Sequence, residues 1–175
     1  MRTLKPLAVG LLLVLGLAAC APAHDWRELR PEGSSVQFML PCRPSVLERK
    51  VRLAGRDVKL NLHACSAGGQ TWALAEADMQ DAALVTAALQ ELRNTAQGNL
   101  GAASGTVVAW TAPGATPNPA AVRLALQGRL PDGKAAQEHV AVFAHGTRVF
   151  QATALGEHLP EEALDTFFSA LRLRS

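Results

Sequence analysis

The feature that most constrains the fold is a strict alternation of apolar and polar residues around a glycine-containing turn. Apolar side chains occupy every second position before Ala54-Gly55-Arg56 and again after it, as far as Ala64. This pattern is typical of two antiparallel strands with one buried and one solvent-exposed face. A register centred on Gly55 pairs residues whose numbers sum to about 110, so Cys65 falls opposite position 45. The hairpin is therefore expected to bring Cys65 close to Cys42.

Two further segments have helical spacing. Apolar residues recur every three or four positions between Leu84 and Ala96, after a candidate N-cap at Asp81 and before Gly98, which predicts a long helix. A short C-terminal helix is predicted from Pro160, which suits a first helical position, because Leu164, Phe167, Phe168 and Leu171 form an apolar stripe at helical spacing. Asp25 is a candidate cap for a helical turn over Trp26–Arg30.

The remaining apolar segments alternate as strands do, and they indicate an antiparallel meander in the second half of the chain. Leu171 and Leu173 either continue the last helical stripe or form an edge strand. The expected fold class is α+β: an antiparallel β-sheet packed by one long helix and one short C-terminal helix. The predicted strands are 36–40, 51–53, 58–64, 70–77, 107–110, 122–126, 140–144 and 149–155.

Two short stretches, Phe38–Pro44 and Phe167–Leu173, resemble segments of bacterial periplasmic domains with the PsbP-like fold. Phe38-Met39-Leu40-Pro41-Cys42-Arg43-Pro44 is similar to their F-x-x-P-x-x-P opening. Phe167–Leu173 is similar to their F-x-x-S-F-x-L ending, with Ala170 in place of the serine and Leu171 in place of the phenylalanine. The resemblance spans most of Trp26–Leu173 and implies a PsbP-like sandwich. That group has no shared active site, so no functional residue follows from it.

The N-terminus has the parts of a secretory signal. Arg2 and Lys5 precede an apolar run that is shorter than the roughly 20 residues of a membrane-spanning helix. The run ends in Leu17-Ala18-Ala19-Cys20, which resembles the lipobox of bacterial lipoproteins. This resemblance implies cleavage before Cys20 and attachment of acyl chains such as palmitate to that residue, which would anchor the protein to a membrane. The expected organisation is a signal peptide (1–19), a lipidated tether (20–33) and a single α+β domain (34–175).

The same resemblance implies a compartment. Ala21 stands where an aspartate would favour retention at the inner membrane, so the periplasmic face of the outer membrane is the expected location. Outside the inner membrane cysteines oxidise, and Cys42 and Cys65 are the remaining pair. Their disulfide would close a loop of about 24 residues and stabilise the fold by about 3 kcal/mol.

Charge argues against nucleic acid as a partner. The excess of two positive charges in the whole chain comes from Arg2 and Lys5, and the part after residue 19 has 15 basic and 15 acidic side chains. A nucleic-acid-binding domain would have a clear basic excess. We expect the partners to be the membrane, through the lipid anchor, and another envelope protein.

Catalytic and metal sites have little support in the sequence. His63 and Cys65, with Cys42 nearby, have ligand types that zinc prefers, but an oxidised cysteine pair cannot bind the metal. No Gly-x-Ser-x-Gly motif is present, and His139 and His145 have only Glu138 beside them. We therefore predict no enzyme activity, no catalytic residue, no metal and no cofactor.

Two groups of residues have both a functional and a structural interpretation. The hairpin is rich in basic residues, which either contact anionic lipid headgroups or an acidic partner, or are a solvated face that deters pairing between sheet edges. Large aromatic residues either line a ligand pocket or fill the core. The basic residues are Arg49, Lys50, Arg52, Arg56 and Lys59, and the aromatic residues are Trp72, Trp110, Phe143 and Phe150.

These observations predict a cell-envelope lipoprotein whose domain is a non-enzymatic binding or accessory module. The alternative is a periplasmic small-ligand carrier with an apolar cavity between helix 82–97 and the sheet, lined by Trp72 or Trp110.

Overall fold

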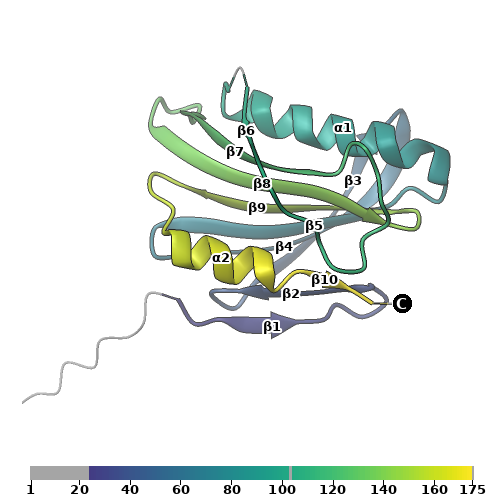
Figure 1. Cartoon of the computed structure of the whole chain (residues 1–175), viewed down its shortest axis with the longest axis horizontal. Helices are drawn as coiled ribbons and strands as arrows, with labels where there is room; N and C mark the ends of the chain where they lie inside the picture. Colours follow the sequence, from purple (N-terminus) through teal and green to yellow (C-terminus); the bar gives the residue numbers. More distant parts are fainter. Residues whose placement is uncertain (1–23, 103, 175) are drawn as a thin grey trace, which may run out of the picture.

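The computed structural model describes residues 24–102 and 104–174 and is dominated by antiparallel β-sheet (Figure 1). Its main sheet has seven strands in the order β3-β4-β5-β9-β8-β7-β6. The predicted meander is present as β7, β8 and β9, and β9 pairs with β5 in the middle of the sheet. The strands are β3 (Ser45–Leu53), β4 (Arg56–Ala67), β5 (Gln70–Asp78), β6 (Thr106–Val108), β7 (Val122–Arg129), β8 (Ala135–His145) and β9 (Arg148–Gly156).

A second, three-stranded sheet joins the two ends of the described chain. β2 (Val36–Leu40) lies in the middle, with β1 (Arg27–Leu29) on one side and β10 (Arg172–Leu173) on the other. The edge-strand interpretation of the C-terminal residues is therefore confirmed, because Leu173 pairs with Val36.

The helical turn predicted over Trp26–Arg30 is wrong. Arg27–Leu29 is strand β1, which lies within the expected tether and pairs with the second half of β2. The Trp26 ring also packs edge-on against Trp72, with 5.7 Å between ring centroids. Pairing with β2 has overridden a weak local preference for a helical turn.

Helix α1 (Ala82–Asn99) begins where the sequence predicted and ends slightly later. The Asp81 carboxylate accepts a hydrogen bond of 2.9 Å from the backbone N–H of Ala83, as an N-cap does. Gly98 was expected just past the end, but it lies inside the helix. Gly101 is the residue with positive φ (60°) after the last turn, and its N–H donates to the Gly98 carbonyl.

Helix α2 (Glu161–Ser169) follows Pro160, which is the cap residue rather than the first helical residue. Its buried side chains are Ala163, Leu164, Phe167 and Phe168. Three of these belong to the apolar stripe that predicted the helix. The stripe's last member, Leu171, lies beyond the helix and is also fully buried.

The two helices cover opposite faces of the seven-stranded sheet, as Figure 1 shows. Side chains alternate between the faces of a strand, so one strand contributes to two cores. α1 packs with Val140, Val142 and Val149 in one cluster, while α2 and β2 pack with Phe143 and Phe150 in the other. The expected α+β class, with two helices packed on antiparallel sheet, is thus confirmed.

The predicted hairpin is present, one residue out of the expected register. Ser45 pairs with Ala64 and Leu53 with Arg56, so paired numbers sum to 109. The turn has two central residues, Ala54 and Gly55, both with positive φ, rather than three. The Cys42–Cys65 disulfide is present, with 6.0 Å between the Cα atoms.

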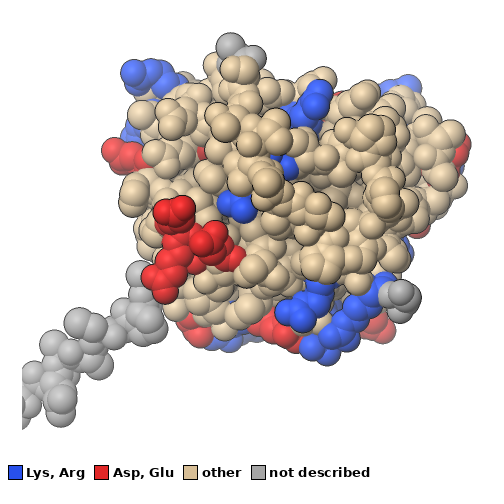
Figure 2. Space-filling model, viewed as in Figure 1, with Lys and Arg blue, Asp and Glu red and all other residues tan. Residues whose placement is uncertain are grey.

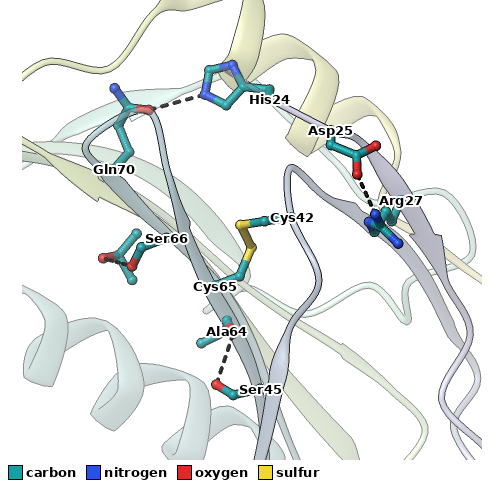
Figure 3. Close-up of a disulfide and its surroundings, with 10 residues drawn as sticks. His24, Asp25, Arg27, Cys42, Ser45, Ala64, Cys65, Ser66 and Gln70 are labelled. Atoms are coloured by element: carbon teal, nitrogen blue, oxygen red, sulfur yellow. Dashed lines mark hydrogen bonds and ion pairs between the residues drawn. A yellow bond between two sulfur atoms is a disulfide. The ribbon is translucent and has the colours of Figure 1, made fainter. Parts of the chain in front are cut away.

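The described chain enters the domain at the end where β4 turns into β5. His24 Nε2 lies 3.2 Å from the Gln70 side-chain oxygen, close to the disulfide (Figure 3). Gln70 begins β5 and Ala67 ends β4, whereas the turn at Ala54-Gly55 is at the opposite end of β4. The domain therefore has an end at which residue 24 enters and a distal hairpin tip.

Candidate partner surface on the distal hairpin

The hairpin tip is built by a turn that matches strand twist. Ala54 and Gly55 have φ of 47° and 76°, as in the two-residue turns that best connect antiparallel strands. The Ala54 N–H donates a hydrogen bond of 2.8 Å to the Glu91 carboxylate of α1. Leu53 and Val58 are buried in the core under α1. The tip is thus held to the body of the protein rather than projecting freely.

The five basic residues predicted as a partner surface divide between two faces of the hairpin. Lys50 pairs with Lys59 across the strands, and Arg52 shares their face. Arg49 lies opposite Leu60 on the other face, on the side of α1, and Arg56 lies opposite Leu53 on that side too. All five side chains are exposed. The structure brings them together on one hairpin but not into one flat patch.

Ion pairing leaves three of these cations, Arg49, Lys50 and Arg56, without a carboxylate among the described residues. Lys59 pairs with Glu48 at 2.7 Å, and Arg52 pairs with Asp57 at 3.6 Å. The Arg56 guanidinium donates to the Gln80 side-chain oxygen at 3.3 Å. Arg49 and Lys50 make no ion pair with any residue in 24–102 or 104–174, so the middle of β3 keeps an uncompensated positive charge.

β3 is also an edge strand of the main sheet. It pairs with β4 alone, and residues 45–50 are all exposed. Two large apolar side chains lie on it in the open: Val46 is 64% exposed and Leu47 is 40% exposed. Successive residues point to opposite faces, so the strand exposes apolar surface on both sides of the sheet.

A polar groove that sequence reasoning missed lies beside the Lys50 face of the hairpin. Two adjoining hollows of about 250 and 380 Å³ share Lys59, Asn61, Glu76 and Arg148 as lining residues. Glu76 is only 5% exposed, and its carboxylate pairs with the Arg148 guanidinium and accepts a hydrogen bond from the Ser34 hydroxyl. The sequence signal that could have revealed this groove is Glu76, a glutamate at a buried position of an otherwise largely apolar strand. Its partners, Ser34 and Arg148, come from segments 42 and 72 residues away.

The aromatic candidates belong mainly to the core. Trp72, Phe143 and Phe150 are at most 1% exposed. Trp110 is half-buried and lines a hollow of about 270 Å³ under the loop before β7, where Phe143 is another wall. Its indole N–H donates to the Phe168 carbonyl at 3.1 Å. This hollow lies where β7 begins and β8 ends, not between α1 and the sheet as the carrier hypothesis expected.

The residues that were considered and rejected as metal ligands, Cys42, His63 and Cys65, have other partners in the structure. Cys42 and Cys65 are joined to each other, and His63 packs against the Phe38 ring, where burial lowers the pKa of its imidazole. No group of three His, Cys, Asp or Glu side chains in this part of the chain could hold a metal ion.

The histidines of β8 are separated from their neighbouring acid. Glu138 and His139 are consecutive strand residues and so point to opposite faces. His139 Nδ1 accepts a hydrogen bond of 3.1 Å from the buried Arg123 guanidinium. Burial, and then the charge of Arg123, lower the pKa of His139. His145 contacts the Gly114 carbonyl instead, at 2.9 Å.

Comparison with known proteins adds no relative. No model of a known protein family matches the chain, and no curated protein matches it. Within residues 24–102 and 104–174, neither helix is both long and apolar enough to cross a membrane. The predicted lipidation site Cys20 and the predicted signal peptide (1–19) lie outside the described residues.

Proposed function

We propose that this protein is a bacterial cell-envelope lipoprotein, anchored by acyl chains on Cys20, whose domain is a non-enzymatic binding module for another envelope protein. The observation that carries the proposal is the sequence Leu17-Ala18-Ala19-Cys20 at the end of a short apolar run. It stands only a few residues before a domain with the disulfide Cys42–Cys65, a bond typical of oxidising compartments.

The charge distribution supports anchoring by acyl chains rather than by the protein surface. Glu161 and Glu162 lie in the first turn of α2, and Figure 2 shows acidic side chains gathered there, beside the start of the described chain. Anionic headgroups would repel such a surface. Stable attachment would therefore come from two or more acyl chains, each contributing about 0.8 kcal/mol per buried methylene.

If the protein is anchored through Cys20, the distal hairpin is the surface that lies farthest from the membrane and is available to a partner. Cys20 is four residues before His24, and an extended chain spans at most about 3.6 Å per residue. β4 has 12 residues and rises about 3.3 Å per residue, so the hairpin tip would lie tens of ångströms from the anchor. We place the protein on the periplasmic face of the outer membrane and assign its domain to the PsbP-like sandwich, both as parts of this proposal.

A small-ligand carrier remains the second candidate because of the hollow beside Trp110. Its volume of about 270 Å³ is slightly below the usual range for ligand pockets, which begins near about 300 Å³. Quenching of tryptophan fluorescence by an apolar ligand in wild type but not in Trp110→Phe would favour this function over the module.

Metabolic labelling tests the anchor directly. Cells are grown with an alkyne analogue of palmitate, and the immunoprecipitated protein is coupled to a fluorophore. We expect label on the wild type and none on Cys20→Ser. Cys42→Ser is the matched control and should keep its label, because Cys42 belongs to the disulfide. An unlabelled wild type, or equal labelling of Cys20→Ser, contradicts the proposal.

A further inference from the structure

We infer that the free edge of β3 binds an extended, acidic segment of the partner protein, which adds to the seven-stranded sheet as an eighth strand. This inference builds on the proposed function, because it says how the binding module contacts its partner. It depends on the backbone and charges of β3 rather than on the lipid anchor.

The backbone of β3 offers unpaired hydrogen-bonding groups at alternate residues. In a two-residue hairpin the residues that flank the turn form a hydrogen-bonded pair, and such pairs then recur at every second position. Here that pair is Leu53 and Arg56, so the odd-numbered residues of β3 bond to β4. The N–H and C=O groups of the even-numbered residues point away from the sheet. These residues are Val46, Glu48, Lys50 and Arg52.

This edge lacks several features that usually prevent pairing. β3 is nine residues long and contains no proline. Native edges are often short, broken by a bulge or covered by another segment. β3 instead pairs with β4 through all nine residues without interruption and exposes Val46 and Leu47. Its basic side chains are the one protective feature that it shares with other edges, and they also determine what can bind.

Charge selects an acidic segment over a second copy of this chain. β3 has three cations (Arg49, Lys50, Arg52) and one carboxylate (Glu48). Two copies of β3 in antiparallel pairing would bring these net positive strands together, and like charges opposite each other are destabilising. Glutamate or aspartate opposite Lys50 and Arg52, which share one face, would instead place carboxylates beside two of these cations, and Lys50 has no ion pair within the described chain. An apolar residue at intervening positions would cover Leu47.

A peptide probe tests both parts of the inference. The full-length protein, purified in detergent, is titrated into a fluorescent, capped eight-residue peptide of alternating valine and glutamate. Binding is followed by fluorescence anisotropy. We expect it to be at least about tenfold tighter than for the matched valine–lysine peptide, and to weaken with added salt. Failure of the valine–glutamate peptide to bind, or equal binding of the two peptides, overturns the inference.

Variants at one position separate the backbone from the charge. Lys50→Pro removes an outward N–H without removing a bond to β4, a position at which strands tolerate proline. Lys50→Gln removes the same charge and keeps the N–H. We expect Lys50→Pro to weaken peptide binding by about tenfold and Lys50→Gln by about threefold or less. Equal effects of the two variants contradict strand addition.

Further variants and a measurement of oligomeric state cover two complications, namely destabilisation by Lys50→Pro and dimerisation of the protein. If Lys50→Pro lowers the melting temperature, Glu48→Pro serves as a second outward-facing variant, and Arg49→Glu with Lys50→Glu tests charge with the backbone intact. Light scattering reports the oligomeric state. A wild-type dimer that Lys50→Pro makes monomeric would show that a second copy occupies the edge. Loss of fatty-acid labelling would refute the anchor and leave the peptide result unaffected.

Discussion

At the scale of single residues, Glu138 is the side chain whose ionisation should most affect stability. It lies on β8, on the face covered by α1, and is 6% exposed. Among the described residues, no hydrogen bond or ion pair reaches its carboxylate. Burial alone therefore raises its pKa from an ordinary value of 4.5 to about 7.

The raised pKa of Glu138 determines how the stability of the protein changes with pH. Between pH 4.5 and about 7 the folded protein binds more protons at Glu138 than the unfolded chain does, so the free energy of unfolding falls as pH rises. Above this range the charged carboxylate costs about 3 kcal/mol, at about 1.36 kcal/mol per pKa unit. We expect Glu138→Gln to be more stable than wild type by about that amount at pH 8, and to match it near pH 4.

Urea unfolding of both proteins across this pH range measures the difference. His63 and His139, whose pKa burial lowers, are present in both proteins, so their contributions cancel in the comparison. Glu157→Gln is the control, because Glu157 is exposed and should leave the pH profile unchanged. A Glu138→Gln profile parallel to that of wild type would show that the carboxylate is not penalised in the folded state.

At the scale of elements, the β3–β4 turn holds one residue in an unfavourable conformation. Ala54 has a φ of 47°, a left-handed conformation that costs a residue with a Cβ about 1 kcal/mol. Asparagine tolerates this region, and Asn-Gly is the preferred pair in such turns. We expect Ala54→Asn to raise the free energy of unfolding by about 0.5–1 kcal/mol.

The neighbouring glycine provides the opposite change in the same turn. Gly55 has a φ of 76° and no atom within 4 Å of an added Cβ, so Gly55→Ala would add only backbone strain. It should destabilise the protein by about 1 kcal/mol. Chemical denaturation of both variants checks the pair. Equal effects of the two substitutions would mean that φ does not control the stability of this turn.

Elements with a complete pattern of their own were predictable from sequence, and elements that depend on pairing with another segment were not. The alternation of apolar residues before Leu53 and after Arg56 was sufficient to predict the hairpin. The helical spacing of apolar residues between Leu84 and Ala96 was sufficient to predict α1. β1 has only three residues and exists because it pairs with β2. The predicted register of β3 and β4 was one residue out. The length of the turn sets this register, and that length depends on the φ angles of Ala54 and Gly55.

The candidate surface shows the same limit. The basic residues of the hairpin were visible in sequence, but their division between two faces depends on the register of β3 and β4. The edge position of β3 is a property of the sheet order, which alternation within a strand does not specify. The Glu76–Arg148 pair joins β5 to β9, two strands separated by α1 and three other strands along the chain.

At the scale of the whole molecule, the disulfide joins the two sheets. Cys42 follows β2 of the three-stranded sheet, and Cys65 lies in β4 of the seven-stranded sheet. The bond spans 23 positions, so it limits the unfolded chain and should stabilise the folded state by about 3 kcal/mol. We expect the double variant Cys42→Ser, Cys65→Ser to unfold at lower urea concentration by this amount.

The reducing agent dithiothreitol separates the cross-link from the side chains. Wild type should lose stability when it is reduced, whereas the double serine variant, which has no bond to break, should unfold at the same urea concentration with and without the reagent. The hairpin should remain folded in both, because Leu53 and Val58 stay packed beneath α1. An unchanged midpoint for reduced wild type would mean that β2 and β4 are held together by Phe38 and its neighbours without help from the bond.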